Sequence, residues 1–464
     1  MKKRKLNTSV VKNGSLYILG NLFNKAVAFI TVPIFTRILT TEEYGIVNTY
    51  TSWVYMLAVV VGLSLGNSIR NAYVDFNKEL GEYISSIFTL ATINFGVIFV
   101  VAQFVLSKLN VSRTLVILCL IESFGNFIVN AIIVRYIMEE KATKRTLLLI
   151  LPNLIGAILS VILITNFHSN KYYGRIVATC FSTIVFGLGI LIYYIVKYRK
   201  LVVKKYWMYA LPISIPLIFH GLSCNILGTS DRTIITAYRG AAEAGIYSLI
   251  YNLSMVASVV TSSAESIWIP KFYNAMREKD YKSVNQHIKI YVYTVLFAFC
   301  GLLTVAPELI VLLGGKQYLV GSTMIVPIVA AAFVMFIYGI YVNVEYYYKK
   351  TMMIATSTFI AAILNLLLNL VFVPRFGAFA ASVTTLVAYI VSLILHGATA
   401  HKLDCKIAPP KIFLFPVFIF SLSCAVSFIW RDNIITIWII IIFLGAIYGI
   451  KVWREFGREK RDGE

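Results

Sequence analysis

The amino-acid sequence predicts an all-α membrane protein of 14 transmembrane helices, arranged as two pseudo-symmetric six-helix lobes plus two C-terminal helices. Three observations predict this fold: long apolar segments separated by short charged loops, a one-sided distribution of Lys and Arg among those loops, and an internal repeat. Of the 464 residues, 59% are hydrophobic and 14% are charged, which is too apolar a composition for a water-soluble domain of this size. The expected domains are an N-terminal lobe at 1–200 (helices 1–6), a C-terminal lobe at 201–405 (helices 7–12), and two extra helices with a basic cytoplasmic tail at 406–464.

Each apolar segment is expected to form one helix that crosses the bilayer. A hydrocarbon core of roughly 30 Å needs about 20 apolar residues in a helix. The predicted spans are 14–38, 46–69, 84–107, 114–138, 146–167, 174–196, 207–230, 244–269, 289–313, 321–347, 352–374, 377–400, 412–430 and 434–453.

The distribution of basic residues predicts the orientation of these helices. Lys and Arg accumulate in the cytoplasmic loops of membrane proteins because translocation of cationic segments is disfavoured. Of the 42 Lys and Arg residues, 31 fall in the two termini and alternate loops, ten fall in the opposite loops, and Lys25 lies inside a span. Both termini are therefore expected to be cytoplasmic.

An internal repeat predicts two lobes of similar construction. Segment 43–46, Glu-Tyr-Gly-Ile, matches segment 243–246, Glu-Ala-Gly-Ile, and each follows an odd-numbered span. Segment 174–178 matches 377–381 through a glycine and an alanine four residues apart. Because each copy has six crossings, the copies enter the membrane in the same direction, as in transporters with parallel repeats. Two such lobes can enclose a cavity that opens alternately to either side.

Several classes of protein are excluded by what the sequence lacks. The six cysteines show no paired spacing of the kind that holds a metal or a disulfide framework. No dinucleotide-binding or P-loop motif occurs, and no loop is long enough to fold into a catalytic domain. The net charge of +21 reflects membrane topology and not a nucleic-acid surface. An enzyme or an ATP-driven pump is therefore not expected.

Polar residues inside the spans are candidates for a substrate cavity. A charge at the bilayer centre costs about 2.5–3.5 kcal/mol on insertion scales, so it should face protein or water. Lys25 lies deep in the first span with Asn21 one turn before it, and Glu122, Asn126 and Asn130 form one stripe along the fourth. These residues either line a cavity or form structural hydrogen bonds and ion pairs between packed helices. Glu122 is a potential ion-pair partner of Lys25.

Charged residues near the span ends are further candidates. Asp231 precedes Arg232 at the outer end of the seventh span, where it forms either a site for H⁺ or Na⁺ or a surface salt bridge. Glu265 and Arg70 lie towards the cytoplasmic ends of their spans. Arg70 either lines a polar mouth or anchors its helix at the interface. Asp231, Glu122 and Glu265 are the candidates for binding a coupling ion.

Three segments resemble the polysaccharide transporter flippases (Wzx-like) of the multidrug/oligosaccharidyl-lipid/polysaccharide exporter superfamily. The first is Thr-Arg-Ile-Leu-Thr-Thr-Glu-Glu-Tyr-Gly at 36–45. The second is Ser-Asp-Arg-Thr-Ile-Ile at 230–235, followed by Ala-Gly-Ile-Tyr at 244–247. The third joins Asn-Leu-Leu-Leu-Asn at 365–369 to Pro-Arg-Phe-Gly-Ala-Phe-Ala-Ala at 374–381.

The resemblance implies a flippase in the bacterial cytoplasmic (inner) membrane. Its cargo would be an undecaprenyl-pyrophosphate-linked oligosaccharide repeat unit, moved to the outer leaflet for O-antigen, capsule or exopolysaccharide synthesis. Lys25, Arg37, Arg70 and Arg232 would bind the anionic pyrophosphate. No cofactor is implied besides a coupling ion, H⁺ or Na⁺, and the partners would be membrane lipid, a polysaccharide polymerase and chain-length machinery.

Three alternatives stay open. Fourteen spans also fit a lipid II-type flippase, in which the last two helices help to form a groove for the lipid tail. A cation-coupled multidrug exporter of the same superfamily would use Glu122 and Asp231 to attract cationic drugs. A membrane-bound polysaccharide polymerase fits least well, because such an enzyme has a large outer loop that this chain lacks.

Overall fold

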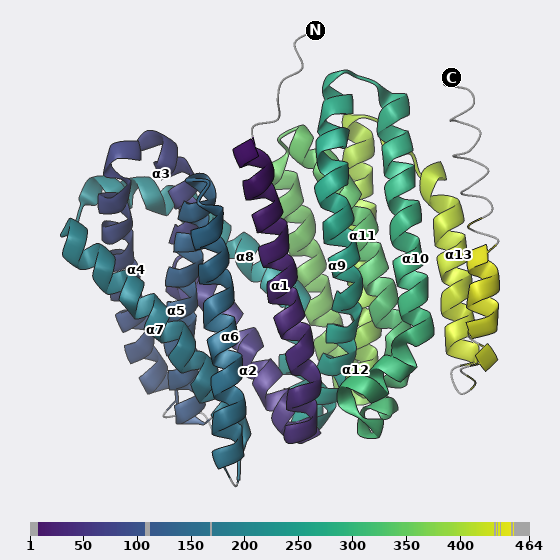
Figure 1. Ribbon diagram of the computed structural model, residues 1–464, viewed down its shortest axis with the longest axis horizontal. Coiled ribbons are helices and arrows are strands. Elements are labelled where there is room, and N and C mark those ends of the chain that lie inside the picture. Colours follow the sequence, from purple (N-terminus) through teal and green to yellow (C-terminus); the bar gives the residue numbers. More distant parts are fainter. Residues whose placement is uncertain are drawn as a thin grey trace. The chain divides into compact units, whose positions relative to one another are not determined.

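The computed structural model describes residues 8–106, 112–167, 169–430, 433, 435–436, 438–446 and 449, and the regular structure among them is entirely helical (Figure 1). The α-helices are α1 (Thr8–Ile38), α2 (Thr41–Val61), α3 (Ile69–Asp75), α4 (Leu80–Leu106), α5 (Arg113–Met138), α6 (Ala142–Asn166), α7 (Tyr172–Tyr198), α8 (Lys204–Arg239), α9 (Ala241–Arg277), α10 (Tyr281–Gly314), α11 (Ile325–Tyr347), α12 (Thr351–Leu403) and α13 (Lys411–Ile429). Short 3₁₀ helices are η1 (Leu65–Ser68), η2 (Asn77–Glu79) and η3 (Lys316–Met324).

The all-α membrane fold is confirmed. Within the described ranges, eleven helical segments are long and apolar enough to cross a membrane. The count of fourteen stays a prediction. α12 contains both predicted spans 352–374 and 377–400, α1 contains 14–38 but is not among the eleven, and 434–453 lies partly outside the described residues. The basic tail from 451 onwards lies wholly outside them.

The chain divides into two compact units, Met1–Thr236 and Ala237–Glu464. Most of α8, the expected first helix of the C-terminal lobe, therefore groups with the first unit. Two hydrogen bonds hold the N-terminal part of α8 against the first unit. The Trp207 indole donates to the Ser86 carbonyl (3.1 Å), and the Tyr206 hydroxyl donates to Glu79 (2.8 Å). In the second unit, α9 packs against both α10 and α11 (Figure 1).

The predicted continuous span 46–69 is wrong, because the helix breaks in the middle. α2 ends at Val61, and Leu63 and Ser64 adopt left-handed backbone conformations before η1 and α3 begin. The break leaves carbonyl groups without helical partners, which is costly at membrane depth unless protein satisfies them. The amide of Asn94 in α4 donates to the carbonyls of Val60 (3.0 Å) and Val61 (2.9 Å). One side chain from a neighbouring helix thus stabilises the interruption.

α12 is broken at Gly377, the first residue of the predicted span 377–400. Gly377 has φ +67°, in the left-handed region that glycine adopts without a steric penalty. The Glu243 carboxylate accepts a hydrogen bond from the Ala378 backbone N–H at 2.6 Å, which caps the second half of the helix. Both residues belong to the second unit.

Glu43 of the first unit, which the sequence repeat aligns with Glu243, has the same role. The Glu43 carboxylate accepts a hydrogen bond from the Lys171 N–H at 2.6 Å, directly before α7 begins. In each unit, the acidic residue of the repeated motif therefore binds the backbone at the start of the last helix of the repeat. The repeated sequence corresponds to a repeated capping contact.

Close packing of α5 on α7 sets the geometry of the first unit. A Cβ atom on Gly187 would lie 2.9 Å from the Cα of Gly125, so each glycine allows the other helix to approach. The contact lies three residues from Glu122 along α5. It therefore brings the polar stripe of α5 against the polar residues of α7.

Candidate functional site

A cavity of about 360 Å³ lies inside the first unit, between α1, α2, α5, α6 and α7. Its wall is unusually polar for a helix bundle that is apolar enough to cross a membrane. The polar residues are Asn24, Thr31, Tyr50, Thr51, Tyr55, Glu122, Asn126, Asn130, Asn153, Arg175, Thr179 and Thr183. Pockets for small molecules are typically about 300–1,000 Å³ with a few convergent polar groups, so this cavity is a candidate binding site.

Glu122 is the acidic residue of this wall. Its side chain is 7% exposed, and its Oε2 accepts a 2.7 Å hydrogen bond from the Tyr50 hydroxyl and a longer one, 3.5 Å, from Thr179. These donors come from α2 and α7, so the carboxyl group joins three helices. Pairing between Glu122 and Lys25 stays a prediction.

Arg175 is the basic residue of the same wall and was not expected there. The predicted span 174–196 contains it at its outer end, and the structure places it in the first turn of α7. Its Nη1 donates to the Ser160 hydroxyl of α6 at 3.0 Å, and the guanidinium lies 3.9 Å from the centre of the Phe35 ring. Its charge also acts on Glu122 electrostatically. One acid and one base therefore face the cavity together.

Amide side chains form the rest of the polar wall. Asn130 donates to the Asn126 backbone carbonyl at 2.9 Å, and both residues of the stripe lie in the cavity wall. Asn153 donates to the side-chain oxygen of Asn24 at 3.0 Å. Amides present donors and acceptors without net charge, which suits the recognition of hydroxyl groups.

The predicted cations lie elsewhere. Lys25 is half-buried on α1 but does not belong to the residues that line this cavity, and the neighbouring Asn21 accepts a 2.7 Å hydrogen bond from Arg145. Arg37 at the end of α1 and Arg70 in α3 are exposed. The structure thus brings Glu122 and Asn126 together in the cavity wall, but none of these three cations.

The candidates for an ion site lie in different surroundings. Asp231 and Arg232 are buried within α8, 1% and 7% exposed, and the roles predicted for them stay predictions. Glu265 lines a separate cavity of about 240 Å³ in the second unit, with Trp268 and Tyr291 beside it. No group of three or more His, Cys, Asp or Glu side chains that could hold a metal ion occurs among the residues that the structure describes.

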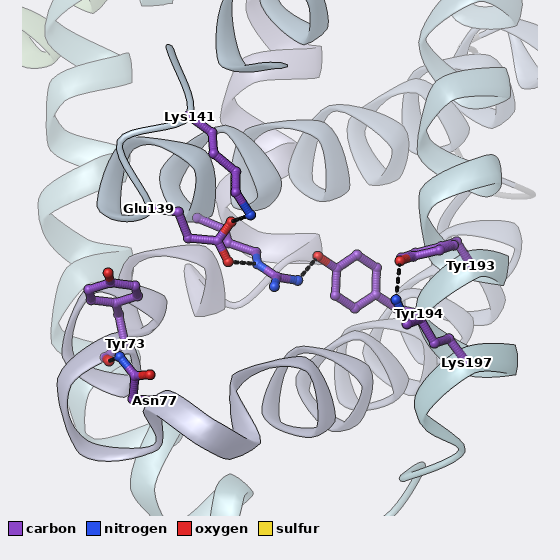
Figure 2. A network of polar contacts seen from close by, with 8 residues as sticks. Tyr73, Asn77, Glu139, Lys141, Tyr193, Tyr194 and Lys197 are labelled. Atoms are coloured by element: carbon purple, nitrogen blue, oxygen red, sulfur yellow. Dashed lines mark hydrogen bonds and ion pairs between the residues drawn. The ribbon is translucent and has the colours of Figure 1, made fainter. Parts of the chain in front are cut away.

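A second polar cluster lies at the end of the first unit that is predicted to face the cytoplasm. Arg135 and Lys141 form ion pairs with Glu139 at 2.7 and 2.6 Å, and Arg135 also donates to the Tyr194 hydroxyl (Figure 2). Burial acts to raise the pKa of the Glu139 carboxyl, but the hydrogen bonds from Lys141 and Arg135 outweigh burial and lower it. The cluster joins the ends of α5 and α7.

Sequence reasoning did not find Tyr50, Asn24, Asn153, Thr179 or Arg175. Tyrosine and threonine are common at membrane interfaces and in packed helices, so the residue types of Tyr50 and Thr179 do not by themselves indicate a cavity. Arg175 could have been found from its neighbours, because it directly follows the glycine of the repeated segment 174–178.

The comparisons with known proteins agree with this architecture. Residues 10–276 match the family described as polysaccharide biosynthesis protein. Two relatives come from Haemophilus influenzae. The Lsg locus putative protein 1 is 25% identical over 76% of this chain and 89% of its own length, and an uncharacterized membrane protein is 21% identical over 77% and 89%.

Solved structures show the same fold. The lipid II flippase MurJ in an inward closed conformation aligns with a TM-score of 0.73 at 15% identity, covering 95% of this chain and 99% of that one. A multidrug resistance MATE family transporter of the MOP superfamily, facing inward, aligns with a TM-score of 0.63 at 14% identity over 82% and 94%. With its many apolar helices, the protein is a multi-pass membrane protein, and the predicted resemblance is confirmed: the chain belongs to the polysaccharide biosynthesis protein family.

Proposed function

We propose that this protein is a flippase that moves undecaprenyl-pyrophosphate-linked oligosaccharide from the cytoplasmic to the outer leaflet of the bacterial cytoplasmic membrane by alternating access. The observation that carries the proposal is the polar cavity inside the first unit. Family membership supports a role in polysaccharide synthesis, and the fold is one that transporters adopt. Both termini would be cytoplasmic.

The cavity wall suits a sugar head group. Moving a hydroxyl group out of water without a hydrogen-bond partner costs roughly 2–7 kcal/mol, so a sugar with several hydroxyls needs many partners. Asn24, Asn126, Asn130 and Asn153 supply neutral donors and acceptors within one wall. The polyprenyl tail would remain in lipid, where it needs none.

The charged residues would bind the anionic and remaining polar groups of the cargo. Arg175 is held by Ser160 and Phe35, so its guanidinium is oriented before cargo arrives, and it would bind an anionic or hydroxyl group of the head. Lys25, Arg37, Arg70 and Arg232 remain the proposed contacts for pyrophosphate on its path. Transport itself requires no covalent chemistry.

The test is a gene deletion in the native host, complemented with variants. We expect lipid-linked oligosaccharide to accumulate in the inner leaflet of the deletion strain, and Asn153→Leu to restore export poorly because it removes an amide from the cavity. Asn166→Leu is the matched control: it changes the same residue type on α6 at an exposed position outside the wall. Normal glycan export in the deletion strain would overturn the proposal.

Two other outcomes identify other cargoes. Accumulation of lipid II in the deletion strain would assign the protein as a lipid II-type flippase. Increased drug susceptibility with normal glycan export would assign it as a multidrug exporter. The second cavity favours the exporter over other rivals, because Glu265 and aromatic side chains such as Trp268 and Tyr291 suit a cationic, flat molecule.

A further inference from the structure

The cavity of about 240 Å³ in the second unit has aromatic walls with a few polar groups among them. It is formed by α9, α10, α11 and α12, which all belong to that unit. Drug-sized ligands occupy pockets of about 300–1,000 Å³, so this cavity has room for a smaller molecule, on the scale of a single ring. Among the described residues, neither Lys nor Arg lines it, whereas Arg175 lines the cavity of the first unit.

Trp268 places an unsatisfied hydrogen-bond donor in this wall. The side chain is 4% exposed, and its Nε1–H is buried without a hydrogen-bond partner among the described residues. The ring stacks on Tyr291, with ring centres 5.0 Å apart and planes 9° apart, and on Phe272, with centres also 5.0 Å apart. The indole therefore has stacking partners within the protein, but its N–H has none. Since buried donors are almost always paired, this one calls for an acceptor from a bound molecule.

Three other polar side chains of the wall offer acceptor atoms. The Ser254 and Thr261 hydroxyls both donate to backbone carbonyls of α9, at 2.7 and 3.0 Å, and the Asn343 Nδ2 donates to a carbonyl of α11 at 2.8 Å. A hydroxyl that has donated its only hydrogen can still accept, and the Asn343 Oδ1 accepts as well. A ligand must therefore bring donors to these atoms and an acceptor to Trp268.

These two requirements distinguish between classes of ligand. A hydroxyl group meets both, because it donates one hydrogen and accepts through two lone pairs. A flat cation suits the residue types of the wall, but it brings no acceptor to the indole N–H. An anion such as a phosphate brings acceptors only, and it would be desolvated where no described Lys or Arg compensates its charge. A neutral sugar ring, with hydroxyls around its edge, fits better than either charged class.

We propose that this cavity is a binding site for one neutral sugar ring. Trp268 donates to an oxygen of the ring or its hydroxyls, and Ser254, Thr261 and Asn343 accept from the hydroxyls. The site is separate from the cavity of the first unit and differs from it in having no described cation in its wall. That the ring belongs to the transported head group rests on the proposed function, whereas binding of the sugar does not.

The test is fluorine NMR of the purified full-length protein labelled with fluorotryptophan and titrated with methyl glycosides of neutral hexoses and N-acetylhexosamines. The Trp268 resonance is assigned by its loss in Trp268→Phe. Trp53, which is exposed on α2 and lines neither cavity, is assigned in the same way by Trp53→Phe and is the matched control. We expect at least one glycoside to shift the Trp268 resonance saturably and to leave the Trp53 resonance in place.

Two results of this titration would overturn the proposal. One is that no glycoside shifts the Trp268 resonance saturably, since a water molecule would then suffice for the indole N–H. The other is that tetraphenylphosphonium or inorganic pyrophosphate shifts it and the glycosides do not, since the cavity would then select a charged ligand.

Two variants test the acceptors of the wall. Asn343→Leu and Ser254→Ala each remove one acceptor and should weaken glycoside binding about twofold to tenfold in the Trp268 titration. Unchanged affinity in both variants would contradict the proposal, and if Asn343→Leu fails to fold, the smaller change Ser254→Ala decides. Asn153→Leu, which alters the cavity of the first unit, should leave this titration unchanged.

The outcomes separate this site from the flippase itself. If the deletion strain accumulates lipid-linked oligosaccharide but the Trp268 resonance does not respond to glycosides, the sugar site is refuted and the flippase proposal stands. If the resonance responds but the deletion strain exports glycan normally, the sugar site stands and the flippase proposal is refuted.

Discussion

Substitution of Gly377 by alanine tests how the second half of α12 is anchored. The backbone there has φ +67°, and an added Cβ atom would lie 2.1 Å from the Glu243 Oε1. That oxygen is the acceptor for the Ala378 N–H. The substitution therefore strains the backbone and displaces the cap at the same time.

The expected cost follows from these two effects. With φ +67° and ψ −156° the backbone is in a region that is essentially restricted to glycine, where another L-residue loses roughly 1–3 kcal/mol. Loss of a helix N-cap costs about 0.5–2 kcal/mol. Gly377→Ala should thus lower the free energy of unfolding by about 1.5–5 kcal/mol. Glu243→Ala alone should cost the cap and the partly exposed ion pair of Glu243 with Arg239 (3.2 Å), which adds at most about 1 kcal/mol.

A double-mutant cycle separates the two effects. In a Glu243→Ala background, Gly377→Ala should cost only the backbone strain, so the double variant should be more stable than the sum of the single changes by about 1 kcal/mol. Gly397→Ala is the matched control on the same helix, because its added Cβ would meet the Tyr341 ring at an ordinary 3.5 Å. That change should be neutral or stabilising.

The assay is unfolding of the purified protein in mixed micelles by increasing mole fraction of sodium dodecyl sulfate, followed by far-ultraviolet circular dichroism. The reasoning is refuted if Gly377→Ala and Gly397→Ala have the same stability. It is also refuted if the effects of Gly377→Ala and Glu243→Ala are strictly additive, since the cap would then not be lost in the glycine variant.

Three further outcomes are expected. Tyr50→Phe should destabilise the protein by about 1.5–3 kcal/mol in the same titration, since it removes a buried hydrogen bond to the Glu122 carboxyl; unchanged stability would contradict that contact. Gly187→Val should cost about 1–3 kcal/mol by forcing α5 and α7 apart, and a wild-type transition would show that the two helices do not meet there. Because Glu139 has a lowered pKa, its contribution to stability should be present above the ordinary glutamate pKa of about 4.3 and lost progressively as the pH falls below it; Glu139→Gln should remove that part of the acid-induced loss, measured by unfolding at about pH 7 and about pH 3.

The sequence by itself was enough to predict the helical membrane fold, the membership of a polysaccharide transporter family and most of the helix positions. These features depend on local properties of the chain: runs of apolar residues, the charges between them and short motifs such as 374–381. The same locality explains why the stripe of Glu122, Asn126 and Asn130 was visible, because one helix face follows directly from spacing.

Only the tertiary structure decided which polar groups meet. The interruption after Val61 depends on Asn94 of another helix, and the surroundings of Glu122 depend on Tyr50 and on Arg175, which was not among the predicted site residues. Residues far apart in sequence reach one another through the packing of whole helices, as where two glycines let α5 approach α7. Hydropathy and periodicity describe one helix at a time, so they cannot specify which of its polar side chains will find partners on the next.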